Sequence, residues 1–417
     1  MKHVIIGNGP AGVIAAETLR RADPRGDIVL LGDEPEPPYS RMAIPYLLEN
    51  QIDERGTWLR KDPDHFRRLG VQLKTARAVR VDTADRRVEL ADGSRLPYDR
   101  LLVATGSRPN PPPVPGGDSP GVLPCWTLAD ARRIMARAKP GARVVQMGAG
   151  FIGCIILDPL IARGVQLTLV EMGNRLVPRM MGETAGNLIR RWVERQGVKV
   201  YTSTRLERIE TKTGAETLEV SLSDGTRLPA DLVINATGVR PNVEFLAGSR
   251  IATDAGVKVD AAMQTSVPGV YAAGDVAQAA ELSTGKMIVN AIQPNAADQA
   301  RVAALNMAGK AASLSGTLVM NVLDTMGLIA TSFGQWMGVP GGEGAERADP
   351  ERFRYLRLEF QDDVLVGAHC LGLTEHVGVI RGLIQTRAPL GPWKDRLLKD
   401  PTRLMEAYLA RAQGAVA

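Results

Sequence analysis

Residues 3–12, HVIIGNGPAG, are a short apolar stretch that runs directly into a G-x-G-x-x-G turn. Small and aliphatic residues over 13–22 predict a helix after the turn, and 27–31 predict a second strand. In such a turn the first glycine permits the sharp bend, the second lets the backbone approach a pyrophosphate, and the third lets the helix pack against the strand. The stretch therefore predicts a nucleotide-binding βαβ unit with phosphates at a helix N-terminus.

The same pattern occurs again 141 residues later, at 148–153 with the sequence GAGFIG. A strand is expected over 142–147, a helix over 154–162, and a second strand over 165–170 that ends in Glu171. One glycine pattern is weak in a chain with 43 glycines, but two copies between a strand and a helix, each with an acid about 20 residues on, are specific. The sequence predicts two dinucleotide-binding units.

A second internal similarity supports this duplication. Residues 101–110, LLVATGSRPN, and 232–242, LVINATGVRPN, each close an apolar strand. Each follows a polar β-meander sequence, with hairpin turns expected at 92–94 and 224–226. The proline-rich segment 110–120 predicts a stiff connection between the two units.

Two further regions follow the second unit. The segment 267–276, VPGVYAAGDV, predicts a strand that ends in Gly-Asp, where an aspartate can hydrogen-bond a polyol. Beyond about residue 315 the phosphate-binding signature does not recur. Alternation over 352–360 and helical patterns over 374–386 and 394–411 predict a separate α/β domain.

The composition narrows the class of protein. A chain of 417 residues with 44% hydrophobic residues predicts two to four folded domains. Only 4% of the residues are aromatic, which favours aliphatic cores and argues against a stacking platform for nucleic acid. The net charge of +5 is dispersed, which predicts a solvated surface rather than a nucleic-acid patch.

Targeting and metal signals are also missing from the sequence. The apolar run after Lys2 ends at Gly7, so no secretory leader is expected, and no segment reaches the ~20 apolar residues of a membrane span. The three cysteines form no CxxC pair, so no metal site is predicted. An odd, sparse cysteine count favours a reducing cytoplasm.

Together these motifs resemble the two-dinucleotide-binding flavoproteins, also called pyridine nucleotide-disulfide oxidoreductases, over nearly the whole chain. The chain is most similar to the branch without a redox cysteine, which includes NADH-dependent ferredoxin and rubredoxin reductases and the flavin part of NADH-dependent nitrite reductases. The resemblance implies an α/β fold with two Rossmann-like dinucleotide-binding domains, β-meander insertions and a C-terminal α/β interface domain. The implied order is a first FAD-domain segment (1–113), an NAD domain (114–240), a second FAD-domain segment (241–315) and the interface or dimerisation domain (316–417).

The resemblance also implies cofactor-binding residues. In the FAD half, the residues at the pyrophosphate, ribose, adenine, flavin and ribitol are Gly7, Gly9, Pro10, Ala11, Gly12, Asp33 or Glu34, Arg41, Val79, Ala104, Thr105, Gly106, Gly274 and Asp275. In the NAD half they are Gly148, Gly150, Phe151, Ile152, Gly153, Glu171 and Gly238. Glu171 ends its strand where an acid accepts from a ribose 2′-hydroxyl and repels a 2′-phosphate, which favours NADH over NADPH; the nearby Arg175 could soften that preference.

Three departures from the family pattern bear on the chemistry. Met42 stands where coenzyme A disulfide reductases carry their cysteine, so disulfide and peroxide reduction are disfavoured. Tyr46 stands where ferredoxin reductases often place a lysine. Ile155 replaces the usual glutamate near the nicotinamide; Asp158, one turn on, could partly substitute, and Pro159 is expected to interrupt the helix.

The expected activity is that of an FAD-dependent oxidoreductase that takes hydride from NADH and passes electrons to an acceptor outside the chain. An iron–sulfur protein is the first expectation for the acceptor and a quinone or similar small molecule the second. The alternative is an electron-transfer subunit of a larger complex with weak stand-alone NADH activity. A homodimer or a complex subunit is expected. Because the cofactor carries the chemistry, no side chain is assigned as a catalytic acid or base, the histidines His369 and His376 of the C-terminal region included.

Overall fold

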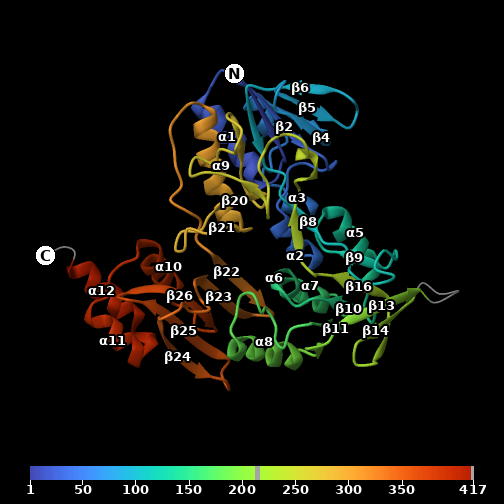
Figure 1. The fold of residues 1–417 in the computed structure, drawn as a ribbon. Coiled ribbons are helices and arrows are strands. Elements are labelled where there is room, and N and C mark those ends of the chain that lie inside the picture. Colours follow the sequence, from blue (N-terminus) through green and yellow to red (C-terminus); the bar gives the residue numbers. More distant parts are fainter. Residues whose placement is uncertain (212–216, 415–417) are drawn as a thin grey trace. The chain divides into compact units, whose positions relative to one another are not determined.

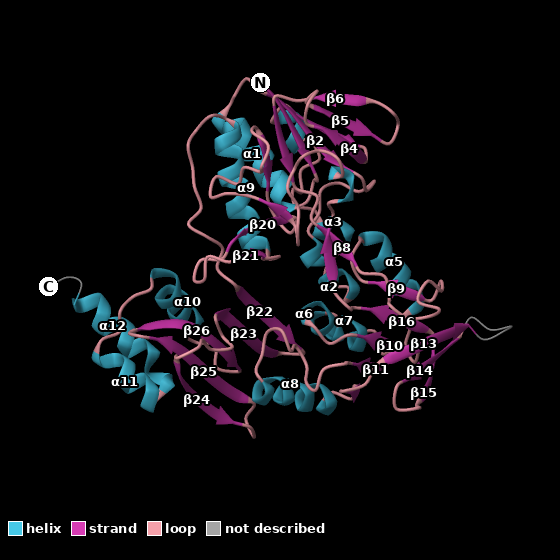
Figure 2. Ribbon diagram, in the orientation of Figure 1, coloured by secondary structure: helices cyan, strands magenta, loops and turns pink. Residues whose placement is uncertain are grey.

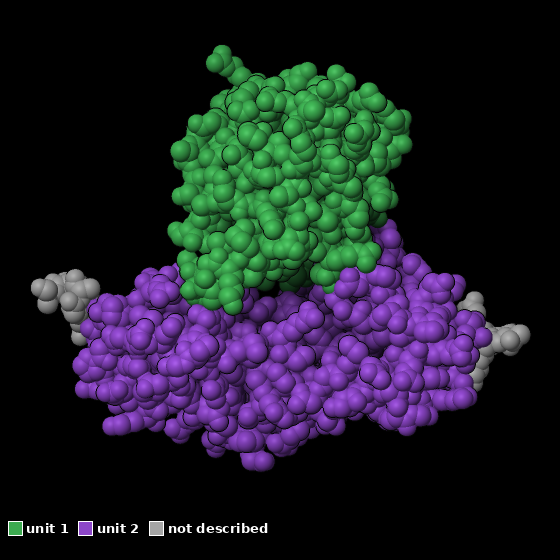
Figure 3. Space-filling model, viewed as in Figure 1, with its two compact units in different colours: residues 1–43, 52–108, 239–318 green, residues 44–51, 109–238, 319–417 purple. Residues whose placement is uncertain are grey.

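A computed structural model describes residues 1–211 and 217–414, and Figure 1 traces the chain through it. The chain forms two compact units, which Figure 3 shows in different colours. Unit 1 contains residues 1–43, 52–108 and 239–318, and unit 2 contains residues 44–51, 109–238 and 319–417. Each unit therefore contains segments that are far apart in the sequence.

Unit 1 is built on a five-stranded parallel sheet of order β19-β7-β1-β2-β3. Its strands are β1 (Lys2–Ile6), β2 (Asp27–Gly32), β3 (Val71–Thr75), β7 (Arg100–Val103) and β19 (Val270–Ala272). Four of the five residues of β1 are buried, as expected for a central parallel strand covered on both faces. The carboxyl ends of these strands present the glycine turn and the segments at Thr105 and Asp275.

Two helices pack against each other in unit 1, α1 (Pro10–Ala22) and α9 (Gln293–Met307). Their buried faces are rich in alanine, including Ala15, Ala16 and Ala300, each 0% exposed. Small side chains let two helices approach closely, so the aliphatic, aromatic-poor core predicted from composition is present.

The remaining elements of unit 1 are small. A meander contains β4 (Ala78–Asp82), β5 (Arg87–Leu90) and β6 (Arg95–Pro97), and a second three-stranded sheet contains β18 (Val257–Lys258), β20 (Ala277–Ala280) and β21 (Met287–Val289). Short helical turns are η1 (Arg41–Ala43), α3 (Glu54–Thr57), α4 (His65–Arg68) and η2 (Glu244–Leu246). The two-stranded pair β8 (Ser107–Pro109) and β17 (Val239–Pro241) follows the two A-T-G segments.

Unit 2 repeats the first sheet. Its five parallel strands have the order β12-β11-β10-β16-β9. Four of them, β12, β11, β10 and β16, correspond to β3, β2, β1 and β7, whereas the edge strand β9 precedes the central strand in the chain and β19 follows it. They are β9 (Val122–Pro124), β10 (Arg143–Met147), β11 (Gln166–Val170), β12 (Lys199–Tyr201) and β16 (Leu232–Asn235). The meander is β13 (Leu206–Thr211), β14 (Leu218–Leu222) and β15 (Arg227–Ala230), with a positive φ of 85° at Gly225 in its hairpin.

Helices that accompany this sheet of unit 2 are α2 (Ile44–Leu48), α5 (Leu128–Arg137), α6 (Phe151–Ile155), α7 (Leu157–Ala162) and α8 (Glu183–Arg195), shown in cyan in Figure 2. The sequence predicted a helix over 154–162 interrupted by Pro159; the interruption is confirmed, but the predicted start was three residues too late. The helix begins at Phe151 and is divided at Ile156, because Pro159 has no N–H to continue the backbone hydrogen-bond series.

The C-terminal region of unit 2 is an antiparallel sheet of order β22-β23-β26-β25-β24 with three helices. The strands are β22 (Met320–Thr325), β23 (Leu328–Gly334), β24 (Glu343–Asp349), β25 (Arg354–Gln361) and β26 (Val364–Leu371). The helices are α10 (Val377–Thr386), α11 (Pro392–Lys399) and α12 (Leu404–Gly414), with the turn η3 (Pro401–Arg403) between the last two.

The single helix predicted over 394–411 was also wrong. The chain forms two helices there, because Asp400 is extended and its side chain accepts from the amide of Thr402 (3.1 Å), directly before Pro401. The predicted fold class is confirmed: two parallel sheets with glycine turns, two meanders and a C-terminal α/β domain. In the part of the chain that the structure describes, no helix is long and apolar enough to cross a membrane.

Candidate dinucleotide-binding sites

The first glycine turn, in unit 1, separates the roles of its three glycines. A Cβ added at Gly7, whose φ is +110°, would collide with the carbonyl oxygen of Ala104, and one at Gly12 would collide with that of Gly7. At Gly9 an added Cβ would meet no protein atom within 4 Å. The first and third glycines are therefore required by the backbone itself, whereas the space beside Gly9 is left for a ligand.

The helix behind this turn is suited to an anion. Gly9 is the N-cap of the 13-residue helix α1, with Pro10 at the first position and no side-chain cap. The first-turn amides of α1 are thus directed toward the open space beside the second glycine, where a pyrophosphate accepts hydrogen bonds and gains from the helix dipole.

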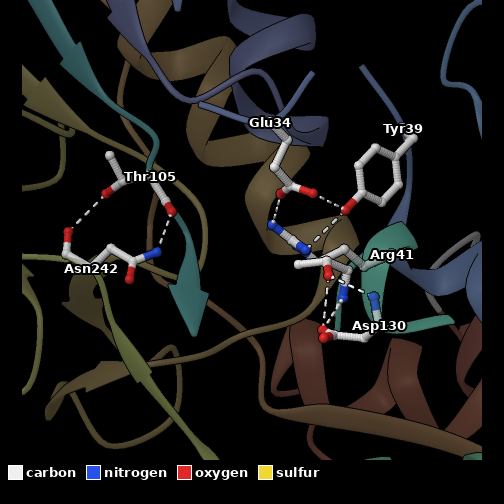
Figure 4. A network of polar contacts seen from close by, with 7 residues as sticks. Glu34, Tyr39, Arg41, Thr105, Asp130 and Asn242 are labelled. Carbon is white, nitrogen blue, oxygen red and sulfur yellow. Dashed lines mark hydrogen bonds and ion pairs between the residues drawn. The ribbon is translucent and has the colours of Figure 1, made fainter. Parts of the chain in front are cut away.

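The sequence did not decide whether Asp33 or Glu34, the two acids after β2, would bind the adenosine ribose. The contacts of Tyr39 and Arg41 distinguish the two. The Tyr39 hydroxyl donates to one oxygen of Glu34 (2.6 Å), and the Arg41 guanidinium donates to the other (2.6 Å), as Figure 4 shows. Asp33 lies next to the strand end and is exposed. Glu34 is thus committed to fixing Arg41, while Asp33 faces solvent.

Asp275 and Ser107 come together at the carboxyl end of this sheet. The Ser107 hydroxyl donates to Asp275 (3.3 Å), and burial raises the pKa of Asp275 although that hydrogen bond and the Arg41 charge lower it. The preceding Gly274 has φ of +84°, and its Cβ position would lie 3.1 Å from the Cβ of Ala11 in α1. The structure therefore brings the predicted Gly-Asp segment directly against the helix of the glycine turn.

Asn242, which sequence reasoning did not assign, fixes the A-T-G segment. Its side-chain amide donates to the Thr105 carbonyl (2.8 Å), and the Thr105 hydroxyl donates to the Asn242 carbonyl (2.9 Å), as Figure 4 shows. Its amide oxygen accepts from Arg108 (2.6 Å), whose ion pair with Glu244 lowers the pKa of that carboxyl to about 2. The repeated R-P-N sequence was the available signal for this residue.

Two other positions in unit 1 bear on the predicted FAD site. Val79 lies at a register shift in β4, is 45% exposed, and has no described contact that joins it to the other predicted FAD residues. The N-terminus of α9 was not predicted as part of the site: it has no side-chain cap, and the Ser40 hydroxyl donates to the side chain of Gln293 (3.2 Å). A second uncapped helix start therefore lies in the unit that carries the first glycine turn.

The second glycine turn, in unit 2, repeats the geometry of the first. Gly148 has φ of +99°, and its added Cβ would lie 2.6 Å from the carbonyl oxygen of Ala236; at Gly153 it would collide with that of Gly148. At Gly150, the N-cap of α6, nothing lies within 4 Å. Phe151 and Ile152 form the first turn of α6, so the predicted phosphate-binding residues are contiguous here.

Glu171 follows β11 directly and is bound to the turn. Its two carboxylate oxygens accept from the amides of Ala149 (2.7 Å) and Gly173 (2.7 Å), which fixes the side chain beside the second glycine turn. Arg175 donates to Met181, Asn174 and Pro178 within its own loop. The guanidinium is therefore engaged and is not paired with Glu171.

Gly238 and its neighbours lie at the end of β16. Gly238 has φ of +110°, with only the side chain of Asn110, at 3.6 Å, near its Cβ position. The main-chain amide of Asn110 donates to the Gly238 carbonyl (2.9 Å), and the side-chain amide of Asn235 donates to the main-chain carbonyl of Asn110 (2.7 Å). The second A-T-G segment is thus held open beside the glycine turn of its own unit.

Asp158 makes a contact that differs from the predicted one. Its carboxylate accepts from the amide of Met326 (3.1 Å), and the indole N–H of Trp192 donates to the carbonyl of the same residue (3.1 Å). Burial and the nearby Asp324 raise the pKa of Asp158. Asp158 therefore connects α7 to the β22–β23 turn. This contact explains why a carboxylate stands at this position, and no role at the nicotinamide is needed to explain it.

The cysteines and the buried histidine are chemically quiet. Burial raises the pKa of Cys125 and of Cys370 to about 12 and raises that of Cys154 as well, so the thiols stay protonated at neutral pH. His369 is 2% exposed and lies against the rings of Trp336 and Tyr355; burial lowers its pKa to about 4. None of these groups is set up as a thiolate nucleophile or a proton carrier at neutral pH.

Two parallel sheets that share four corresponding strands, each with a glycine turn whose second glycine borders open space, define a two-dinucleotide-binding protein. The sequence model of the pyridine nucleotide-disulphide oxidoreductase family matches residues 1–303. The chain therefore belongs to that family and is an oxidoreductase. The matched span covers both glycine turns, both A-T-G segments and Gly274-Asp275. The family identified from the sequence motifs is thereby confirmed.

Similar proteins carry related functions. The NADH-dependent phenylglyoxylate dehydrogenase subunit epsilon of Aromatoleum evansii is 34% identical over 405 residues, which cover 96% of this chain and 95% of that protein. A biphenyl dioxygenase system ferredoxin–NAD(+) reductase component of Paraburkholderia xenovorans is 36% identical over 66% of each chain. The crystal structure of the covalent putidaredoxin reductase–putidaredoxin complex matches 99% of both chains with a TM-score of 0.91 and 27% identity.

Proposed function

We propose that this protein is an FAD-dependent NADH oxidoreductase whose electrons leave to a separate iron–sulfur protein. The observation that carries the proposal is the duplicated glycine turn in which, both times, only the second glycine borders open space. An open second glycine at a helix start suits a bound pyrophosphate, and the two turns suit two dinucleotides. FAD, when bound, accepts a hydride and releases single electrons.

In this proposal unit 1 holds FAD. The first-turn amides of α1 bind the pyrophosphate beside Gly9, and the exposed Asp33 accepts from the adenosine ribose. Glu34 and Tyr39 orient Arg41 toward the nucleotide phosphates, which a bidentate guanidinium binds well. Asp275, held by Ser107, accepts from the ribitol chain.

The second turn, within 114–240, binds NADH. Glu171 is fixed by two amides, and each of its oxygens retains a lone pair that can accept from a ribose 2′-hydroxyl. A 2′-phosphate would bring like charge against this carboxylate, and Arg175 is engaged within its own loop. Both features favour NADH over NADPH.

The side chains of this protein hold the two nucleotides in place; none of them is assigned a proton-transfer step. Met42 and the buried thiols provide no thiolate, so the chain's contribution is to hold two nucleotides and to exclude disulfide exchange. The acceptor is expected to be an iron–sulfur protein, since a relative named as a ferredoxin–NAD(+) reductase component is 36% identical over 66% of each chain.

A second candidate is a subunit of a larger dehydrogenase. The favouring observation is the match to subunit epsilon, because it covers 96% of this chain and 95% of that relative. In that setting the same NADH chemistry would deliver electrons to a neighbouring subunit rather than to a diffusing ferredoxin. Ile155, which stands in the place of the family glutamate, then corresponds to a weaker stand-alone activity.

One experiment tests the proposal and separates the two candidates. The purified holoprotein is mixed with NADH in anaerobic stopped flow, and then assayed in steady state with ferredoxin, a quinone and oxygen in turn. Fast loss of the visible flavin band and turnover with ferredoxin support the free reductase. Slow flavin reduction without turnover on any added acceptor supports the subunit, and an unchanged flavin band contradicts the free reductase.

A further inference from the structure

We propose that Gln146 is a positioning residue for the nicotinamide nucleotide, a role that rests on the proposed use of NADH at the second glycine turn. Gln146 lies in β10, two residues before Gly148, and is 0% exposed. Its side-chain amide donates to the carbonyl of Gly148 (3.1 Å) and to that of Gly153 (2.9 Å). One buried side chain thus connects the first and third glycines of the turn through two hydrogen bonds.

The other end of this amide makes the arrangement costly. The Gln146 oxygen is buried and has no hydrogen-bond partner in the part of the chain that the structure describes. A buried, unsatisfied amide oxygen destabilises a protein, and an aliphatic side chain of similar shape would avoid that cost. A polar residue retained at a position that stability alone would fill with an apolar one indicates a functional constraint.

The equivalent position in unit 1 shows the apolar alternative. Ile5 also lies two residues before the first glycine of its turn and is also 0% exposed. The helix that follows that turn, α1, has 13 residues, whereas α6 has five and ends before the break at Ile156. A five-residue helix has few backbone hydrogen bonds to hold its first turn, so Gln146 replaces part of the rigidity that α1 supplies from its length.

The consequence for binding is specific. Gly150 and its amide lie between the two glycines that Gln146 joins, and they border the open space of the turn. Loss of both hydrogen bonds would let the turn and the start of α6 move apart, so that the amides no longer converge on a pyrophosphate. The bound nicotinamide nucleotide would lose affinity, while the FAD site, in a different unit, would keep its own.

The chain offers a matched control in unit 1. Gln299 in α9 is 2% exposed, and its oxygen accepts from the amide of Gly274 (2.8 Å), the glycine before Asp275. It is thus a buried glutamine that fixes a glycine of the other nucleotide site. Gln146→Met and Gln299→Met each remove a buried amide of similar size, so a general loss of stability would affect both in the same way.

The test measures FAD content, thermal unfolding, and the KM and kcat for NADH of the purified holoproteins. Gln146→Met should keep its FAD and raise the KM for NADH about 5- to 20-fold, with a smaller change in kcat. Gln299→Met should lose FAD and, when refilled with excess FAD, keep the KM of the wild type. An unchanged KM in Gln146→Met, or equal loss of FAD in both variants, would overturn the inference.

A third variant gives a readout that a merely structural role would not produce. In Gln146→Glu the buried carboxyl has a raised pKa, and below that pKa its O–H donates one hydrogen bond to a glycine carbonyl. Above it the carboxylate repels both carbonyls. The KM for NADH of this variant should therefore rise with pH relative to the wild type, and a parallel pH profile would contradict the role. Failure of the wild type itself to be reduced by NADH would instead reject the proposed function.

Discussion

The two glycine turns have the same backbone, but their surroundings differ. In unit 1 the strand ends in Gly32, and the space beside it is filled by the side chain of Asn8 from the turn. In unit 2 the strand is followed by Glu171, whose side chain accepts from the amide of Ala149, the residue that corresponds to Asn8. The space between the glycine turn and the end of the second strand is thus filled by a turn side chain in unit 1 and by a side chain that follows the strand in unit 2.

The difference extends to what supports each turn. Unit 1 uses a long helix and an apolar Ile5, whereas unit 2 uses a short helix, the buried Gln146 and the charged Glu171. The first turn is thus held by packing, and the second by side-chain hydrogen bonds. This suits a nucleotide that stays bound in unit 1 and one that binds and leaves in unit 2.

The largest expected effect tests the shared backbone. Gly12→Ala would place a Cβ against the Gly7 carbonyl, and we expect a loss of about 4 kcal/mol or more in the free energy of unfolding. Gly9→Ala meets no protein atom within 4 Å, so it should fold normally but bind FAD weakly. Urea denaturation and FAD titration check both, and similar stability of the two variants would contradict the assigned roles.

The next effect concerns the side chain that only unit 2 possesses. Glu171→Ala should lower the preference for NADH over NADPH about 10- to 100-fold, because the acceptor for the 2′-hydroxyl and the repulsion of a 2′-phosphate are both lost. The ratio of kcat/KM for the two coenzymes measures this. Glu207→Ala, an exposed acid in β13, is the control and should leave the ratio unchanged; the same result for Glu171→Ala would remove its role.

A smaller effect concerns the contact between α7 and the β22–β23 turn. Because the folded-state pKa of Asp158 is raised, its charged form destabilises the protein at neutral pH. Asp158→Asn keeps an acceptor for the Met326 amide and removes that charge, so it should add up to about 1 kcal/mol at pH 7. The gain should disappear below the unfolded pKa of about 3.8, where the carboxyl is protonated in both states. A gain that is independent of pH would show that the charge is not the cause.

The smallest effect is expected at the cysteines. Burial holds the Cys125 thiol protonated, so Cys125→Ala should leave turnover with NADH unchanged. Turnover of the variant is compared with that of the wild type in the presence and absence of a thiol-alkylating reagent. A loss of more than about half of the activity would reinstate a redox thiol.

Much of this comparison was predictable from local sequence. A glycine at the first and third positions is required by backbone collisions within a few residues, so the pattern predicts the turn in both units. The two meanders followed from the duplication. Helix ends were less predictable. The interruption at Pro159 was expected, but Pro401 also divides a segment that the apolar pattern alone presents as one helix.

The polar contacts that distinguish the units were not predictable in the same way. The choice between Asp33 and Glu34 depends on hydrogen bonds from Tyr39 and Arg41 to Glu34. These contacts form only because the loop after β2 folds back, which the sequence does not specify. Gln146 had one signal, a polar residue in the interior of the strand RVVQM. Asp158 could not be assigned, because its partner Met326 lies 168 residues away.

The most direct test of NADH-dependent flavin reduction is an anaerobic titration of the holoprotein with NADH and with NADH deuterated at the transferred position of C4. We predict complete loss of the visible flavin band at one NADH per FAD, with slower reduction by the deuterated coenzyme. A flavin band that NADH leaves unchanged, while dithionite removes it, would contradict hydride transfer between the two nucleotides.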